Sequence, residues 1–117
     1  MSNILEDVKK YVGIHPTESV FDDQLLININ TVMLALNQFG IGPSTPFNAT
    51  SLSTWDELLG DVPKNGIDTY VCMRVRMLFD PPTNTYTMQA LENSISEFEW
   101  RILFDADNRN REEDSGE

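Results

Sequence analysis

The stretch from residue 18 to residue 40, ESVFDDQLLININTVMLALNQFG, carries the clearest helical pattern in this sequence. Apolar side chains recur at every third or fourth position and form one stripe, made of Leu25, Ile29, Val32, Leu36 and Phe39. We expect a helix that begins between residues 18 and 23, where Thr17, Ser19 and Asp22 are alternative caps, and that ends at Gly40. Its asparagines are poor helix formers, so packing against other helices must stabilise it.

Helical spacing also dominates the sequence on either side of this stretch. Periodic apolar residues predict helices at residues 3–12, 66–79 and 84–104. Thr54 and Glu57 have the spacing of a capping box, which predicts one or two helical turns from residue 54 onward. Residues 40–53 are punctuated by glycine and proline and are expected to form a loop. The predicted fold class is therefore all-α, a small bundle of four or five helices.

The composition limits both the size and the class of the protein. The chain has 117 residues, which fits one domain, and its 8 Lys and Arg stand against 19 Asp and Glu, a net charge of −11. A general nucleic-acid binder is excluded, because phosphate contacts need clustered basic residues. No apolar run approaches the ~20 residues of a membrane span, and the N-terminus lacks the apolar core of a secretory signal. We expect a cytoplasmic protein in which the single Cys72 belongs to no disulfide framework.

The acidic excess is partly concentrated at the C-terminus. Residues 105–117, DADNRNREEDSGE, contain six acidic residues, two arginines and one apolar residue, Ala106. With so little to bury, this segment is expected to be a solvated, disordered tail. The predicted organisation is thus a helical domain over residues 1–104, followed by an acidic tail over residues 105–117.

The sequence offers little chemistry for catalysis. His15 is the only histidine and precedes a proline in a connector, and no nucleophile motif or glycine-rich phosphate loop is present. Cys72 lies among apolar residues of the 66–79 helix, which favours a packed thiol over a nucleophile. Neither CxxC nor HExxH spacing occurs, so no metal site is predicted. We therefore expect no enzymatic activity and no cofactor.

Some apolar residues fall outside the predicted core stripes. Ile27 and Leu34 lie about half a turn from the stripe of the 18–40 helix, which makes that helix apolar nearly all round. Trp100 and Phe104 share a patch away from the core stripe of the 84–104 helix. One interpretation is that these four residues form protein–protein interfaces. The other is that a loop covers them, for which the 40–53 segment is long enough.

Arg74 is a second irregularity, because helical geometry places it in the middle of an apolar stripe. A buried guanidinium must be paired, and the candidate partners are Glu92 and Glu99 of the following helix. Alternatively, Arg74 lies at the solvent end of the stripe and extends its charged head outward.

Several segments together resemble one known family. They are FDDQLL at residues 21–26, LNQFGIG at 36–42, WDELL at 55–59, YVCMRVRMLFDPP at 70–82 and EFEWRI at 97–102. Over about residues 3–104 the chain resembles the head–tail connector proteins of tailed bacteriophages, also called neck adaptors or head-completion proteins. The segments VRMLFDPP and EFEWRI carry most of this resemblance.

The resemblance implies a virion structural protein of the phage neck, assembled in the host bacterial cytoplasm and without catalytic residues. It implies that the subunits form a homo-oligomeric ring under the portal protein after DNA packaging. Isolated subunits of such proteins can be monomers that form the ring only on the portal. The ring would extend the channel through which the genome leaves and would dock the next neck or tail-completion protein. The acidic charge fits this role, because a negative wall repels phosphates and lets packaged DNA pass without specific binding.

A second hypothesis comes from a different class of function. An acidic regulatory protein or DNA mimic, which occupies a nucleic-acid-binding partner, would also fit a net charge of −11. The two hypotheses differ in the surface they require, because a mimic needs a charged surface and no second apolar face. A small enzyme is disfavoured, since no nucleophile–base pair is found.

Overall fold

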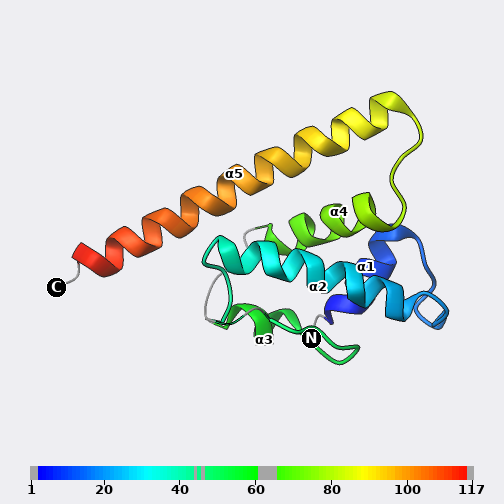
Figure 1. Ribbon diagram of the computed structural model, residues 1–117, viewed down its shortest axis with the longest axis horizontal. Helices are drawn as coiled ribbons and strands as arrows, with labels where there is room; N and C mark the ends of the chain where they lie inside the picture. The colour runs from blue at the N-terminus through cyan, green and yellow to red at the C-terminus, as the bar shows by residue number, and fades with distance from the viewer. Residues whose placement is uncertain (1–2, 44, 46, 61–65, 116–117) are drawn as a thin grey trace.

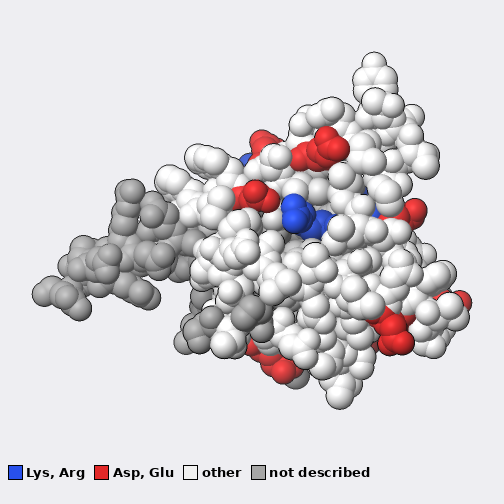
Figure 2. All heavy atoms as spheres, viewed as in Figure 1, with Lys and Arg blue, Asp and Glu red and all other residues white. Residues whose placement is uncertain are grey.

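Five α-helices make up the described part of the molecule, which confirms the predicted fold class (Figure 1). The computed structural model describes residues 3–43, 45, 47–60 and 66–115, with side chains as far as Asp105. The helices are α1 (Ile4–Val12), α2 (Asp22–Gln38), α3 (Trp55–Leu59), α4 (Ile67–Phe79) and α5 (Thr85–Ser115). On the face shown in Figure 2, two acidic clusters lie close to a basic cluster near the middle, others lie towards the right and lower edges, and broad uncharged areas separate them.

Local capping defines the ends of the short helices. At the start of α1, Asn3 Oδ1 accepts a hydrogen bond from the backbone N–H of Glu6 at 3.0 Å, and Gly13 closes the helix with φ 85°. At α3 the predicted capping box is confirmed, because Thr54 and Glu57 each bond the other's backbone N–H. The side chain of Asn3 also donates to the carbonyl of Ser51 at 2.9 Å, so the start of α1 is bound to the loop before α3.

Helix α2 begins at Asp22 without a side-chain cap, although three candidates were available in the sequence. Phe21 occupies the N-cap position, and the carboxylate of Asp22 is instead turned to Lys9 of α1 at 2.9 Å. The start of α2 is therefore fixed by a contact with another helix, which the local pattern could not reveal.

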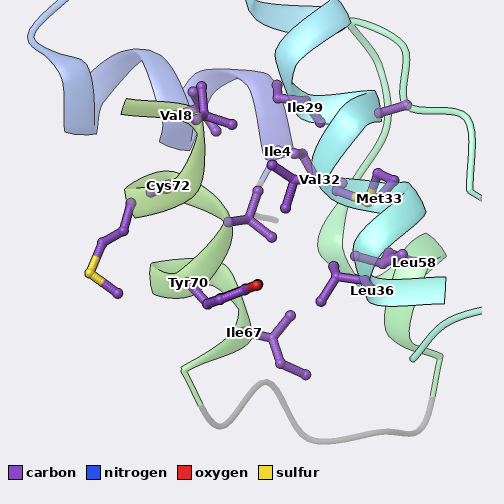
Figure 3. Close-up of a cluster of buried hydrophobic side chains, with 14 of the residues drawn as sticks. Ile4, Val8, Ile29, Val32, Met33, Leu36, Leu58, Ile67, Tyr70 and Cys72 are labelled. Carbon is purple, nitrogen blue, oxygen red and sulfur yellow. The ribbon is translucent and has the colours of Figure 1, made fainter. Parts of the chain in front are cut away.

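The core lies between α1, α2 and α4, whose apolar side chains point towards one another (Figure 3). The predicted stripe of α2 is confirmed, with Phe39 half-buried at its end and the other four members buried. The largest side chains that are almost wholly enclosed are Ile4, Val8, Leu25, Ile29, Val32, Met33, Leu36, Trp55, Tyr70, Val71 and Val75. Helix α3 contributes Trp55, whose indole N–H donates to Asp7 of α1 at 2.7 Å.

Helix α5 packs mainly against α4 and extends past the other helices at its C-terminal end (Figure 1). Its start at Thr85 agrees with the sequence, because Asn84 Oδ1 accepts the backbone N–H groups of Tyr86 and Thr87. Along the predicted stripe, Leu91, Ile95 and Ile102 are buried, and Phe98 is half-buried. The ring of Phe98 lies against Gly66, where a Cβ would come within 2.5 Å of it.

The C-terminal end of α5 differs from the prediction. The helix was expected to end near residue 104, which is wrong, since its backbone stays helical to Ser115. In the sequence, residues 105–115 contain neither glycine nor proline, and two aspartates precede arginines by four positions, a spacing that favours helix. The disorder expected for the acidic tail, and the domain boundary at residue 104, stay predictions.

Candidate interaction surface

The residues considered for catalysis do not form a reactive site. His15 Nδ1 lies 2.8 Å from Thr17 Oγ1 within the exposed connector between α1 and α2. Cys72 is buried in α4, and this burial, followed by the nearby charges of Asp7 and Asp68, raises the pKa of its thiol to about 12. Among the described residues, no group of three or more His, Cys, Asp or Glu side chains is placed to hold a metal ion.

The α5 aromatic pair, Trp100 and Phe104, is at the surface. The two rings stack with centroids 5.3 Å apart and planes inclined by 14°. Trp100 is 64% exposed and Phe104 52% exposed, and the neighbouring Leu103 is also exposed. Contact between the rings removes only part of their area from water, so this patch remains available to a partner.

A second apolar patch lies on α2, where Ile27 is 67% exposed and Leu34 53% exposed. These two residues line a shallow surface hollow, referred to below as the α2 hollow, together with Asn30, Thr31, Phe47 and Asn48. The loop after α2 is held beside this hollow, because Asn30 accepts the backbone N–H of Ala49 at 2.7 Å and donates to its carbonyl at 3.2 Å. The loop borders Ile27 and Leu34 without covering them, so the alternative in which residues 40–53 bury them is wrong.

The chain segment that forms the α2 hollow contains no charged residue, and the nearest charge on α2 is the exposed Asp23, one turn before Ile27. No residue between Gln24 and Trp55 is acidic or basic, although 23% of the whole chain is charged. This segment comprises most of α2 and the loop up to the start of α3, and we call its exposed part the uncharged face. This run without charged residues is visible in the sequence. A search for apolar stripes misses it, because such a search does not look for an absence of charges. Depletion of charge is typical of the centre of a protein interface.

Arg74 and Glu99 come together at the edge of the α4–α5 contact. Arg74 Nη1 lies 4.0 Å from Glu99 Oε2, but the two side chains are 37% and 36% exposed. Arg74 and Glu99 therefore form the predicted pair, but the prediction that this pair is buried is wrong. The guanidinium of Arg74 reaches the surface past Tyr70, and its Cζ lies 5.9 Å from the centroid of the tyrosine ring. Glu92 is exposed and borders the same depression between α4 and α5 as Arg74.

The sequence did not indicate that Tyr70 takes part in the polar contact between α4 and α5. It is fully buried, and its hydroxyl donates a hydrogen bond to Glu99 Oε2 at 2.8 Å. Burial, and next the hydrogen bond to Glu99, raise the pKa of this phenol well above its ordinary value. Glu99 thus connects α5 to α4 through a buried donor and a half-exposed cation, which fixes the rotation of α5 and with it the direction of the α5 aromatic pair.

A comparison with protein families identifies the chain. The model of the family described as phage connector protein matches residues 4–109. The chain belongs to the phage connector proteins. Membership makes this connector a structural component of the virion neck that associates with other head and tail proteins. Among curated protein sequences and solved structures, none matches the connector.

The matched region of the connector includes all the surface features described above. Both apolar patches, the uncharged face and the Tyr70–Glu99 contact lie within residues 4–109. No helix in the described part of the connector is both long and apolar enough to cross a membrane. The interface role of Ile27, Leu34, Trp100 and Phe104 stays a prediction, which their exposure supports.

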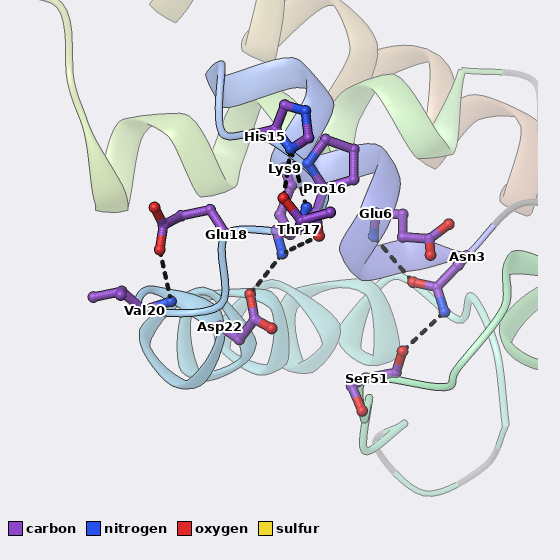
Figure 4. A network of polar contacts seen from close by, with 10 residues as sticks. All are labelled: Asn3, Glu6, Lys9, His15, Pro16, Thr17, Glu18, Val20, Asp22 and Ser51. Atoms are coloured by element: carbon purple, nitrogen blue, oxygen red, sulfur yellow. Dashed lines mark hydrogen bonds and ion pairs between the residues drawn. The ribbon is translucent and has the colours of Figure 1, made fainter.

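Lys9 is a further residue of the connector that sequence reasoning missed. Its ammonium group is buried and contacts Asp22 Oδ1 at 2.9 Å and the carbonyl of Pro16 at 3.1 Å (Figure 4). Lys9 follows Leu5 by four positions and so lies on the buried side of α1, a signal that its charge obscured. These contacts hold the loop between α1 and α2 in place.

Proposed function

We propose that the connector assembles as a homo-oligomeric ring under the portal protein, where it extends the DNA channel and docks the next neck or tail-completion protein. Family membership supports a role at the neck. The α5 aromatic pair supports assembly, because a stacked tryptophan and phenylalanine exposed on a helix that projects from its bundle are suited to anchor an interface.

The charge of the connector supports the proposed channel. A net charge of −11 repels the phosphates of DNA, so packaged DNA would pass along an acidic wall without being bound. The same repulsion acts between subunits, which favours assembly through surfaces without charge. The uncharged face and the two apolar patches are such surfaces.

The acidic charge also favours a second candidate function. A regulatory protein or DNA mimic would use its carboxylates to occupy a nucleic-acid-binding partner. Such a protein has no use for two exposed apolar patches, and the uncharged face would weaken the mimicry. The structural role is therefore the better explanation of the surface.

The proposal is tested by mixing the full chain with the portal protein of the same phage. We expect rings on the portal in electron micrographs, and we expect Trp100→Ala combined with Phe104→Ser to abolish them while circular dichroism stays unchanged. Tyr86→Ala is the matched control, because Tyr86 is an aromatic residue that is 89% exposed near the other end of α5. Binding to DNA-binding host proteins in place of the portal would favour the DNA mimic.

If the double variant unfolds, Trp100 and Phe104 belong to the monomer core, and the interface assignment fails. If it folds and still forms rings, the subunit contact lies elsewhere. If the unaltered chain never attaches to the portal, the proposed function itself is wrong.

A further inference from the structure

The two apolar patches differ in their electrostatic surroundings. On α5, Glu97 precedes Trp100 by one turn and Asp105 directly follows Phe104, so the α5 aromatic pair is bordered by carboxylates. The α2 hollow has one carboxylate near it on its own helix, that of Asp23 at the Ile27 end, and is otherwise bordered by the uncharged face. A second copy of this chain would therefore meet more negative charge at the α5 aromatic pair than at the α2 hollow.

Charge excludes one pairing of the patches. If the α5 aromatic pair of one subunit met the same pair of another, Glu97 and Asp105 of both copies would approach each other. Like charges placed face to face across an interface are costly, and the high net negative charge of each subunit adds to this repulsion. Contact of the α5 aromatic pair with the α2 hollow brings Glu97 and Asp105 near only one carboxylate of α2, that of Asp23 at the Ile27 end, so fewer like charges approach each other.

We propose that the α5 aromatic pair of one subunit inserts into the α2 hollow of the next subunit. This inference rests on the proposed ring and specifies its subunit contact. The two patches lie on different helices of the same chain, so the contact is heterologous, and a repeated heterologous contact gives a ring when its rotation closes. A pairing of two α2 hollows would be isologous and would end at a dimer.

The dimensions of the two patches agree with this insertion. Ile27 and Leu34 are seven residues apart on α2, which corresponds to about 10.5 Å along the helix axis. The centroids of the Trp100 and Phe104 rings are 5.3 Å apart. The aromatic pair and the α2 hollow are therefore of comparable length.

The polar groups of the α2 hollow suit an indole. The hydroxyl of Thr31 already donates to the carbonyl of Ile27 at 3.0 Å, so its oxygen offers lone pairs to an incoming donor. Asn48, also exposed in the hollow, offers an amide oxygen. The indole N–H of Trp100 is the donor that the aromatic pair brings, and it would find an acceptor at either residue.

A cysteine cross-linking experiment on the full chain tests the inference. The variant N48C/L103C places cysteines beside the two patches and leaves Ile27, Leu34, Trp100 and Phe104 in place. Treated with a short bismaleimide under conditions of ring assembly, it should give a ladder of covalent oligomers. Each single variant should stop at the monomer or at a trace of dimer, because a head-to-tail contact joins position 48 to position 103. The native Cys72 is buried and should not react, which the unaltered chain verifies. The control pair N48C/Y86C moves the second cysteine to the other end of α5 and should give no ladder.

A charge placed in the hollow provides a second measurement. We expect T31E in the N48C/L103C background to abolish the ladder, while T69E, at an exposed position of α4, leaves it unchanged. Circular dichroism of both variants establishes that they are folded. The matched pair separates an effect of charge inside the hollow from a general effect of added charge.

The outcomes distinguish this contact from the ring itself. A ladder that also appears with N48C/Y86C, or that survives T31E, overturns the inference. Dimers of the N48C single variant as abundant as products of the double variant indicate an isologous contact and overturn it as well. Absence of a ladder while electron micrographs show rings overturns the inference and leaves the proposed function intact, whereas absence of rings on the portal removes the proposed function.

Discussion

Lys9 is the one charged side chain that is buried among the residues whose side chains the structure describes. Burial of an ammonium group costs free energy unless the group is paired, and Lys9 has a carboxylate and a carbonyl as partners. Both partners belong to the segment that leads from α1 into α2, since Pro16 lies in the connection and Asp22 begins the second helix. One side chain therefore determines how the first two helices are joined.

We expect Lys9→Met to lower the free energy of unfolding by about 2–3 kcal/mol, because it leaves the carboxylate of Asp22 without its cation. The carboxylate is 26% exposed, so the loss should be smaller than for a fully enclosed pair. Urea unfolding measures the effect. In the double variant K9M/D22N the loss should be clearly less than the sum of the two single losses, and simple additivity would show that the pair is not coupled.

Cys72 makes stability depend on pH in the alkaline range. The pKa of the thiol is raised from 9.0 to about 12 in the folded chain, so the folded state keeps a proton that the unfolded state loses. The stabilising contribution is fully present below pH 9 and is lost as the pH rises towards 12. The slope is about half of its full value near the unfolded pKa, and about a pH unit above it we expect the stability to fall by about 1.4 kcal/mol per pH unit on account of this group.

Cys72→Ala should remove this part of the alkaline loss, which urea unfolding at several pH values would measure. Tyr70, whose pKa is raised in the same direction, contributes a further loss that the substitution leaves in place. A thiol reagent at pH 8 should modify Cys72 only after the chain is unfolded. Rapid modification of the native protein would contradict the burial of the thiol.

Helix α5 is fixed to the rest of the molecule over only part of its length. Its buried side chains end at Ile102, and the contact between Glu99 and Tyr70 lies just before that point. The remaining turns continue to Ser115. Helix α5 thus contributes buried side chains to the bundle and, at neighbouring positions, exposes the aromatic pair at the surface.

We expect a chain that ends at Asp105 to melt within a few degrees of the full chain, because no described buried side chain is removed. A chain that ends at Arg101 is the matched comparison, since it also loses Ile102, which is 3% exposed. Its melting temperature should fall by roughly 5–15 °C, as expected for the loss of one buried aliphatic side chain from a small domain. Thermal unfolding followed by circular dichroism compares the two. A loss above about 10 °C in the longer chain would show that residues 106–117 are docked.

Across the whole molecule, a high negative charge coexists with one continuous uncharged segment. Subunits that carry a net charge of −11 repel each other, and salt screens this repulsion over a Debye length of about 10 Å at 0.1 M. The proposed contact contains apolar and neutral polar groups, which salt does not weaken. Ionic strength therefore acts mainly on the repulsion.

We expect ring formation to become faster and more complete as sodium chloride is raised from about 20 to about 200 mM. Light scattering on the full chain with portal protein present measures this directly. Weaker assembly at the higher salt concentration would show that ion pairs hold the subunits together, contrary to the proposed contact.

The sequence predicted those parts of the fold that depend on local patterns. The stripe of α2 and the capping box of α3 are encoded within a few residues, and both were confirmed. The burial of Lys9 and the partial exposure of Arg74 depend on which helices become neighbours. The spacing of Lys9 from Leu5 indicated only the buried side of α1, and the pattern around Arg74 left two alternatives open. For the candidate site, the exposure of Trp100 and Ile27 followed from their positions off the core stripe. The run without charges from Gln24 to Trp55 is also present in the sequence, but apolar periodicity does not reveal it.

The bond between Asn3 and Ser51 has a consequence for the order of folding events. These residues are 48 positions apart, and Trp55 and Asp7 are joined across the same separation. Closing so long a loop costs entropy before any local contact compensates for it. On the ribosome, α1 emerges first, but its bonds to the loop before α3 and its packing against α4 form only later, so a nascent connector carries an incomplete core until α4 has been made.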